Sequence, residues 1–120
     1  MERLLVVDDD EFMRMITVET LIQAGYQAES VNDGEAAWSL LDQHPSEFGL
    51  ILLDKQMPRL DGIGLLKRIK TDERIKDLPV VMLTGAADQK DITEGLAAGA
   101  HYYLTKPAAE NILKSVISNA

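Results

Sequence analysis

The stretch that most constrains the fold is Leu50-Ile51-Leu52-Leu53-Asp54, four consecutive aliphatic residues that end on a carboxylate. An apolar run without polar alternation is typical of a strand in the middle of a parallel sheet, where both faces are covered. Pro58, followed by Asp61-Gly62, indicates a loop and the start of a helix. A buried strand cannot hold an unpaired acid. We therefore expect Asp54 where the strand emerges, at the edge that binds ligands in parallel α/β sheets.

Apolar runs and helical patterns alternate along the chain. We expect strands at 4–7, 26–31, 50–53, 80–83 and 100–104, and helices at 11–24, 34–44, 62–70, 89–98 and after Pro107. Asp10 and Asp88 are the expected N-caps of the first and fourth helices, and Gly25 is the expected C-terminal cap of the first. Polar residues in the second strand indicate a sheet edge. The last helix is expected to bury Ile112, Leu113, Val116 and Ile117.

Five β/α units with short links predict an α/β fold, a doubly wound parallel sheet with right-handed crossovers and helices on both faces. We expect residues 1–120 to form one domain, because no linker or low-complexity tract divides them.

The composition narrows the classes of function. Twenty acids against 12 bases give a formal net charge of -8, which argues against contact with nucleic acid or an anionic membrane. Cysteine is absent, which excludes disulfides, thiol catalysis and zinc–thiolate sites. No apolar run approaches the ~20 residues of a membrane span. We expect a cytoplasmic domain.

Four of the five expected strands end on side chains that can do chemistry. The first ends on Asp8 and Asp9, the third on Asp54, the fourth on Thr84 and the fifth leads to Lys106. Because parallel strand ends meet at one edge of the sheet, these side chains are expected to converge. Clustered carboxylates repel unless a cation offsets them. Oxygen ligands without His or Cys suit Mg²⁺, and with an ammonium and a hydroxyl they are the parts needed for phosphoryl transfer to an aspartate.

Several motifs together carry a resemblance to a known family. They are Val7-Asp8-Asp9-Asp10-Glu11, Leu53-Asp54 with Met57-Pro58 and Asp61-Gly62, Leu83-Thr84-Gly85-Ala86, and Gly99-Ala100 through Tyr103 to Lys106-Pro107. In this order and spacing, the chain resembles two-component response-regulator receiver domains from about Leu4 to its last residue. The resemblance implies a (βα)5 flavodoxin-like sandwich with strand order 2-1-3-4-5.

The same resemblance implies a phosphoacceptor and a metal site. Asp54 would accept a phosphoryl group from a histidine kinase or a phosphotransfer protein. Mg²⁺, with Mn²⁺ as an alternative ion, would be bound by Asp9 and Asp54 directly, by Asp8 largely through a metal-bound water, and by the backbone carbonyl of Gln56. The protein would not be an enzyme beyond self-catalysed phosphorylation and dephosphorylation.

The resemblance also implies a switch that reads the phosphoryl group. Lys106 would pair with Asp54 or the phosphoryl oxygens, Thr84 would bond the phosphoryl group, and Tyr103 would change rotamer in response. The face formed by the fourth helix, the fifth strand and the fifth helix would then bind a downstream protein target. The domain would act as a monomer or as a phosphorylation-dependent dimer.

Some residues depart from the family pattern. Lys55 places a second positive charge next to Asp54, His101-Tyr102 stands where small or acidic residues are common, and Ala108 stands where an aromatic residue is common.

Three other functions are weighed against this one. An aspartate-nucleophile phosphohydrolase of the haloacid-dehalogenase type would use Asp8-Asp9-Asp10, but Phe12 stands where that family has Thr or Val and no cap domain is visible. A degenerate receiver that only binds proteins is disfavoured by the complete set of acids, Thr84 and Lys106. A flavin-binding domain would need a Ser/Thr/Gly-rich phosphate loop after the first strand, which the sequence lacks.

Overall fold

The computed structural model describes residues 3–55, 61–85, 89–106 and 108–119. Strands and helices alternate through them in the order β1 (Arg3–Val7), α1 (Glu11–Gln23), β2 (Ala28–Val31), α2 (Gly34–Gln43), β3 (Phe48–Leu53), α3 (Gly62–Lys70), β4 (Val80–Thr84), α4 (Gln89–Ala97), β5 (Tyr102–Thr105) and α5 (Glu110–Asn119). The strands form one parallel sheet in the order β2-β1-β3-β4-β5, which confirms the predicted fold.

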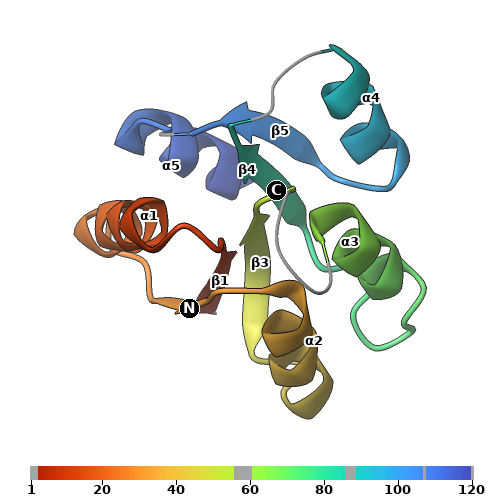
Figure 1. Cartoon of the computed structure of the whole chain (residues 1–120). Helices are drawn as coiled ribbons and strands as arrows, with labels where there is room; N and C mark the ends of the chain where they lie inside the picture. Colours follow the sequence, from red (N-terminus) through yellow and green to blue (C-terminus); the bar gives the residue numbers. More distant parts are fainter. Residues whose placement is uncertain (1–2, 56–60, 86–88, 107, 120) are drawn as a thin grey trace.

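The sheet lies between two layers of helices, with α1 and α5 together on one face and α2 and α3 on the other (Figure 1). The aliphatic run of β3 serves both layers, because successive side chains of a strand point to opposite faces. Leu50 and Leu52 belong to the core under α1 and α5, and Ile51 and Leu53 to the core under α2 and α3. This two-sided burial explains why the central strand has no polar alternation.

Helix N-termini follow the predicted local chemistry. Asp10, Asp33 and Asp61 are N-caps, and each side chain accepts a hydrogen bond from the backbone amide three residues later, at 3.1, 2.7 and 2.8 Å. Such caps satisfy amide groups that have no partner within the helix. Asp10 is thereby confirmed as the cap of α1, whereas Asp88 lies outside the described residues.

Two strands begin later than predicted, β2 at Ala28 instead of residue 26 and β5 at Tyr102 instead of residue 100. In both places the preceding helix ends in the same way. Gly25 and Gly99 have φ angles of 97° and 114°, and the amides that follow them bond back to carbonyls of the preceding helix, Tyr26 N to Leu21 O at 3.0 Å and Ala100 N to Gly95 O at 3.1 Å. This is the Schellman arrangement, which uses the first residue after the glycine to close the helix rather than to start the strand.

The expected inward stripe of α5 is wrong at one position. Leu113 and Val116 are buried, but the side chain of Ile112 is 44% exposed. One residue is a rotation of 100° about a helix, so Ile112 falls outside the stripe that its successor occupies.

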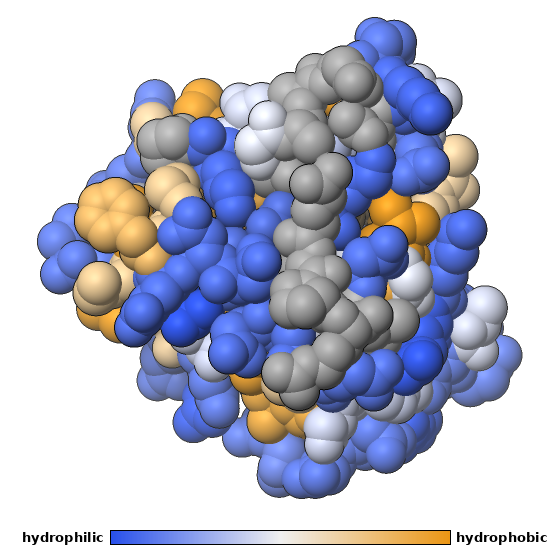
Figure 2. Space-filling model, viewed as in Figure 1, coloured by the Kyte–Doolittle hydropathy of each residue, from blue (hydrophilic) through white to orange (hydrophobic). Residues whose placement is uncertain are grey.

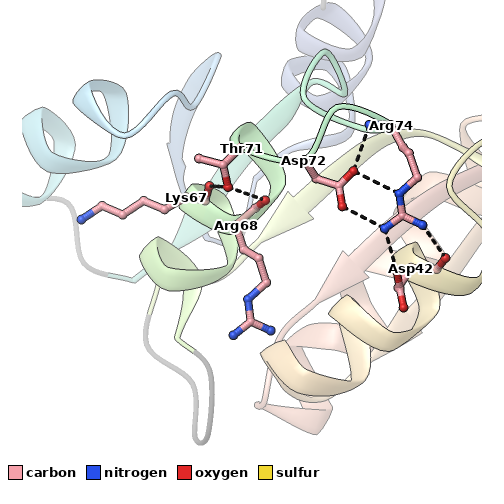
Figure 3. A network of polar contacts seen from close by, with 6 residues as sticks. All are labelled: Asp42, Lys67, Arg68, Thr71, Asp72 and Arg74. Atoms are coloured by element: carbon pink, nitrogen blue, oxygen red, sulfur yellow. Dashed lines mark hydrogen bonds and ion pairs between the residues drawn. The ribbon is translucent and has the colours of Figure 1, made fainter.

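Polar contacts tie α2 to the segment after α3. The guanidinium of Arg74 donates to Asp42 Oδ1 at 2.6 Å and to Asp72 Oδ2 at 2.8 Å (Figure 3). The Arg68 guanidinium of α3 lies 5.2 Å from the ring centre of Trp38 in α2, which is half-buried and packs against the core. These contacts connect α2 with α3 and with the segment that follows it.

The surface in Figure 2 is largely hydrophilic, apart from scattered apolar areas, one of them over α1. Three large apolar side chains of α1 are exposed, those of Phe12, Met15 and Ile22. Among the described residues, no helix combines the length and apolar character needed to cross a membrane.

Candidate functional site

The site begins where β1 and β3 end side by side. Val7 pairs with Leu53 in the sheet, and the Asp54 amide donates to the Val7 carbonyl at 2.9 Å, so Asp8 and Asp54 leave the sheet as neighbours. Behind them, the Gly62 amide donates to the carbonyl of Lys55 at 2.8 Å. A β-carbon on Gly62 would collide with the backbone of Asp54 and Lys55. Glycine at the start of α3 therefore lets the helix lie against the residue that carries the central carboxylate.

Three of the predicted acids gather at this edge. Asp8, Asp9 and Asp54 each offer a carboxylate oxygen, and these oxygens all lie within 4.8 Å of one another. Asp8 and Asp54 are 3% and 5% exposed, whereas Asp9 is exposed. The cluster thus has two acids at its base and one on its open side.

Lys106, just after β5, supplies positive charge to the base of the cluster. Its ammonium donates to Asp8 Oδ2 at 2.9 Å, to Asp8 Oδ1 at 3.2 Å and to Asp54 Oδ2 at 3.1 Å. The sequence led us to expect contact with Asp54, but the stronger engagement of Asp8 was not predicted. Which of two neighbouring carboxylates a lysine contacts depends on their positions in space, and spacing in the sequence does not reveal these positions.

The pKa values in the cluster show how its charges balance. Burial raises the pKa of the Asp8 carboxyl, and this outweighs the hydrogen bonds from the Asp10 amide and Lys106, which act in the opposite direction. Burial alone would lower the pKa of the Lys106 ammonium, but its hydrogen bonds to Asp8 and Asp54 prevail and raise it. One ammonium does not neutralise three acids, so a further cation would be favourable here.

The loop that carries Asp8 and Asp9 is held from α1. The Asp10 amide donates to Asp8 Oδ1 at 2.9 Å, and the Arg14 guanidinium donates to the carbonyl oxygen of Asp8, also at 2.9 Å. The peptide that joins Asp8 to Asp9 is therefore fixed by Arg14. Sequence reasoning missed this residue, because an arginine in the first turns of a helix has no feature that separates it from an ordinary surface charge.

The other residues predicted for the site are Thr84, Tyr103 and Gln56. Thr84 is the last residue of β4 and pairs with Thr105 of β5. Tyr103 lies in β5, half-buried, and its ring lies against α4, where a β-carbon on Gly95 would come within 3.0 Å of two ring carbons. Gln56 lies outside the described residues.

The chain is similar to known proteins in both sequence and structure. A family model described as the response regulator receiver domain matches residues 4–118. The chain is 34% identical to chemotaxis protein CheY1 of Helicobacter pylori, over 93% of this chain and 90% of that protein. It is 37% identical to the DNA-binding dual master transcriptional regulator RpaA of Synechocystis, over 89% of this chain and 44% of that protein. Among solved structures, a putative response regulator from Chloroflexus aurantiacus superposes with a TM-score of 0.91 at 31% identity, covering 98% of this chain and 95% of that one. Chemotaxis protein CheY4 of Vibrio cholerae does so with a TM-score of 0.88 at 30% identity, covering 99% and 98%.

Proposed function

Because the chain belongs to the response regulator receiver domain family, we propose that it receives a phosphoryl group on Asp54 from a histidine kinase or a phosphotransfer protein. Receiver domains are signalling modules of two-component systems, not classical enzymes. The observation that supports Asp54 as acceptor is its place at the end of the central strand, in contact with Lys106 and close to Asp8 and Asp9. A carboxylate at the end of the central strand is held against an ammonium at 3.1 Å, beside two further acids that suit a metal ion.

The donor set fits Mg²⁺. All three side chains offer oxygen, the ligand type that this ion prefers, and within the described residues no His joins the cluster. Both oxygens of Asp8 already contact Lys106, whereas Asp54 contacts it through Oδ2. Asp9 and Asp54 would therefore hold the ion directly, and Asp8 would hold it through a bound water. The carbonyl of Gln56, which lies outside the described residues, would add a ligand on the ground of the family resemblance alone. When bound, Mg²⁺, or Mn²⁺ in its place, would offset the negative charge of the phosphoryl oxygens.

The proposed reaction is an in-line displacement at phosphorus. A carboxylate oxygen of Asp54 forms the new O–P bond while the N–P bond of a donor phosphohistidine breaks, and the electron pair of that bond stays on the departing imidazole. Lys106, whose ammonium already touches Asp54, would donate to a phosphoryl oxygen. Hydrolysis of the acyl phosphate would later restore the carboxylate.

The same proposal includes a readout. The phosphoryl group adds negative charge and acceptor oxygens near the end of β4, where Thr84 would bond it. Tyr103 would change rotamer in response, and the face of α4, β5 and α5 would bind a downstream protein. The domain would act as a monomer or as a phosphorylation-dependent dimer. We further propose that residues 1–120 form one receiver domain that acts in the cytoplasm.

A small phosphodonor such as acetyl phosphate, with and without Mg²⁺, tests the function by intact-protein mass spectrometry. We expect a single Mg²⁺-dependent phosphoryl adduct that Asp54→Asn abolishes. Continuous release of phosphate at enzymatic rates, without an accumulating adduct, would favour the phosphohydrolase. Neither adduct nor turnover would favour the degenerate, protein-binding receiver.

A further inference from the structure

A second cation stands next to the proposed phosphoacceptor and reaches α4. Lys55 directly follows Asp54, and its ammonium lies 3.1 Å from Glu94 Oε1. The Lys55 side chain is 16% exposed and that of Glu94 is 48% exposed. The pair is therefore partly exposed, and it connects the segment after β3 with α4, 39 residues further along the chain.

The residue after Glu94 makes the second contact of α4. Gly95 is buried, and the ring of Tyr103 lies so close that a β-carbon there would come within 3.0 Å of it. One short step of α4, Glu94-Gly95, thus touches both the residue after Asp54 and the tyrosine of β5. Any change in the Lys55–Glu94 pair acts on α4 at the place where the helix meets Tyr103.

We propose that the Lys55–Glu94 ion pair is a latch that restrains α4 and that negative charge added at Asp54 weakens it. The proposal rests on phosphorylation of Asp54 and deepens it by naming residues that carry the signal to α4. The phosphoryl group carries about −1.5 to −2 charges and replaces the single charge of the Asp54 carboxylate, so it adds up to about one negative charge at the residue adjacent to Lys55. Lys106 is already shared between Asp8 and Asp54, so the new charge competes with Glu94 for Lys55.

Thermodynamic linkage turns the latch into a measurable affinity. If charge at Asp54 weakens the ion pair, the ion pair must equally weaken binding of a charged phosphoryl mimic at Asp54. Removing the Glu94 charge removes one competitor for the Lys55 ammonium, whose charge then acts more strongly on the mimic. Because a half-exposed ion pair is worth little in water, the expected effect is modest, about two- to fivefold in affinity.

The test is a double-mutant cycle with beryllium trifluoride, a phosphoryl mimic, at saturating Mg²⁺. Its affinity is measured for the wild type, Glu94→Gln, Lys55→Met and the double variant. Glu94→Gln should bind the mimic about two- to fivefold more tightly than the wild type. In the Lys55→Met background, the same Glu94 change should alter affinity by less than about 1.5-fold. Glu29→Gln is the matched control, since Glu29 forms an ion pair with Arg3 at 3.1 Å on a different part of the surface and should leave affinity unchanged.

Amide exchange in α4 provides a second readout. Without the mimic, the amides of residues 92–97 should exchange faster in Glu94→Gln than in the wild type. Adding the mimic should then increase their exchange rate by a smaller factor in the variant than in the wild type. The latch is refuted if Glu94→Gln leaves affinity and exchange unchanged. It is equally refuted if Glu94→Gln tightens binding by the same factor in the Lys55→Met background. The effect would then come from the loss of one negative charge in general and not from the ion pair. A wild type that binds no mimic and takes no phosphoryl group from acetyl phosphate would instead overturn the proposed function, and the latch with it.

Discussion

Replacement of Lys106 by methionine tests the charge balance of the site. The ammonium makes three contacts of 2.9–3.2 Å with Asp8 and Asp54. The side chain of Lys106 is 13% exposed, that of Asp8 5% and that of Asp54 6%. Removing one partner of a buried ion pair generally costs about 3–5 kcal/mol of unfolding free energy. Because the pKa of Asp8 is already raised by burial, this carboxyl can take up a proton and limit the loss. We expect Lys106→Met to lose about 3 kcal/mol in the absence of Mg²⁺, or roughly 10 °C in melting temperature.

Mg²⁺ should reverse much of this loss. Lys106 repels a cation placed among the same acids, so its removal should tighten Mg²⁺ binding by roughly tenfold, a charge effect of about 1–2 kcal/mol. Urea unfolding followed by circular dichroism, with and without MgCl₂, measures both effects. Lys114→Met, an exposed lysine of α5, makes the same change in net charge away from the site and serves as the control. The reasoning is wrong if Lys106→Met is as stable as wild type without Mg²⁺, or if Mg²⁺ stabilises it no more than wild type.

Three further predictions concern the metal, the backbone at the site and an acid-sensitive contact. Asp9→Asn should lose most of the rise in melting temperature that Mg²⁺ gives the wild type, and an undiminished rise would exclude Asp9 as a ligand. Gly62→Ala should cost about 2–3 kcal/mol in urea unfolding, because its β-carbon would collide with the backbone of Asp54; a neutral change would contradict the close approach. Hydrogen bonds from Arg74 hold the pKa of Asp72 below its ordinary value of 3.8. The stability from this contact is present above pH 3.8 and is lost as pH falls through the lower folded pKa. In an NMR titration, Arg74→Gln should therefore raise the Asp72 midpoint, and an unchanged midpoint would refute the contact.

The sheet and the convergence at its edge could be predicted because both follow from local signals. Aliphatic runs ending on Asp54 and on Asp8-Asp9 identify strands, and parallel topology alone then brings their ends together. Strand starts were less predictable, since the amides of Tyr26 and Ala100 close the preceding helices. That choice depends on three-dimensional hydrogen bonding rather than on propensity.

Contacts between distant charged residues could not be predicted. Nothing in the sequence pairs Lys55 with Glu94, because the two residues are far apart along the chain and only the fold brings their charged groups within 3.1 Å. In the sequence, Gly95 likewise shows no role beyond the lower stability that a glycine gives to the interior of a helix. The structure gives it a purpose, since the ring of Tyr103 occupies the space that a larger side chain would need.

The central claim is that Asp54 alone carries the phosphoryl group, and the most direct test locates that group on the chain. After treatment with acetyl phosphate and Mg²⁺, borohydride reduction converts an aspartyl phosphate into homoserine, and peptide mass spectrometry identifies the position. We predict homoserine at residue 54, dependent on Mg²⁺, and none in Asp54→Asn. Homoserine at Asp8 or Asp9 in the wild type, or labelling of Asp54→Asn at the normal rate, would contradict the account.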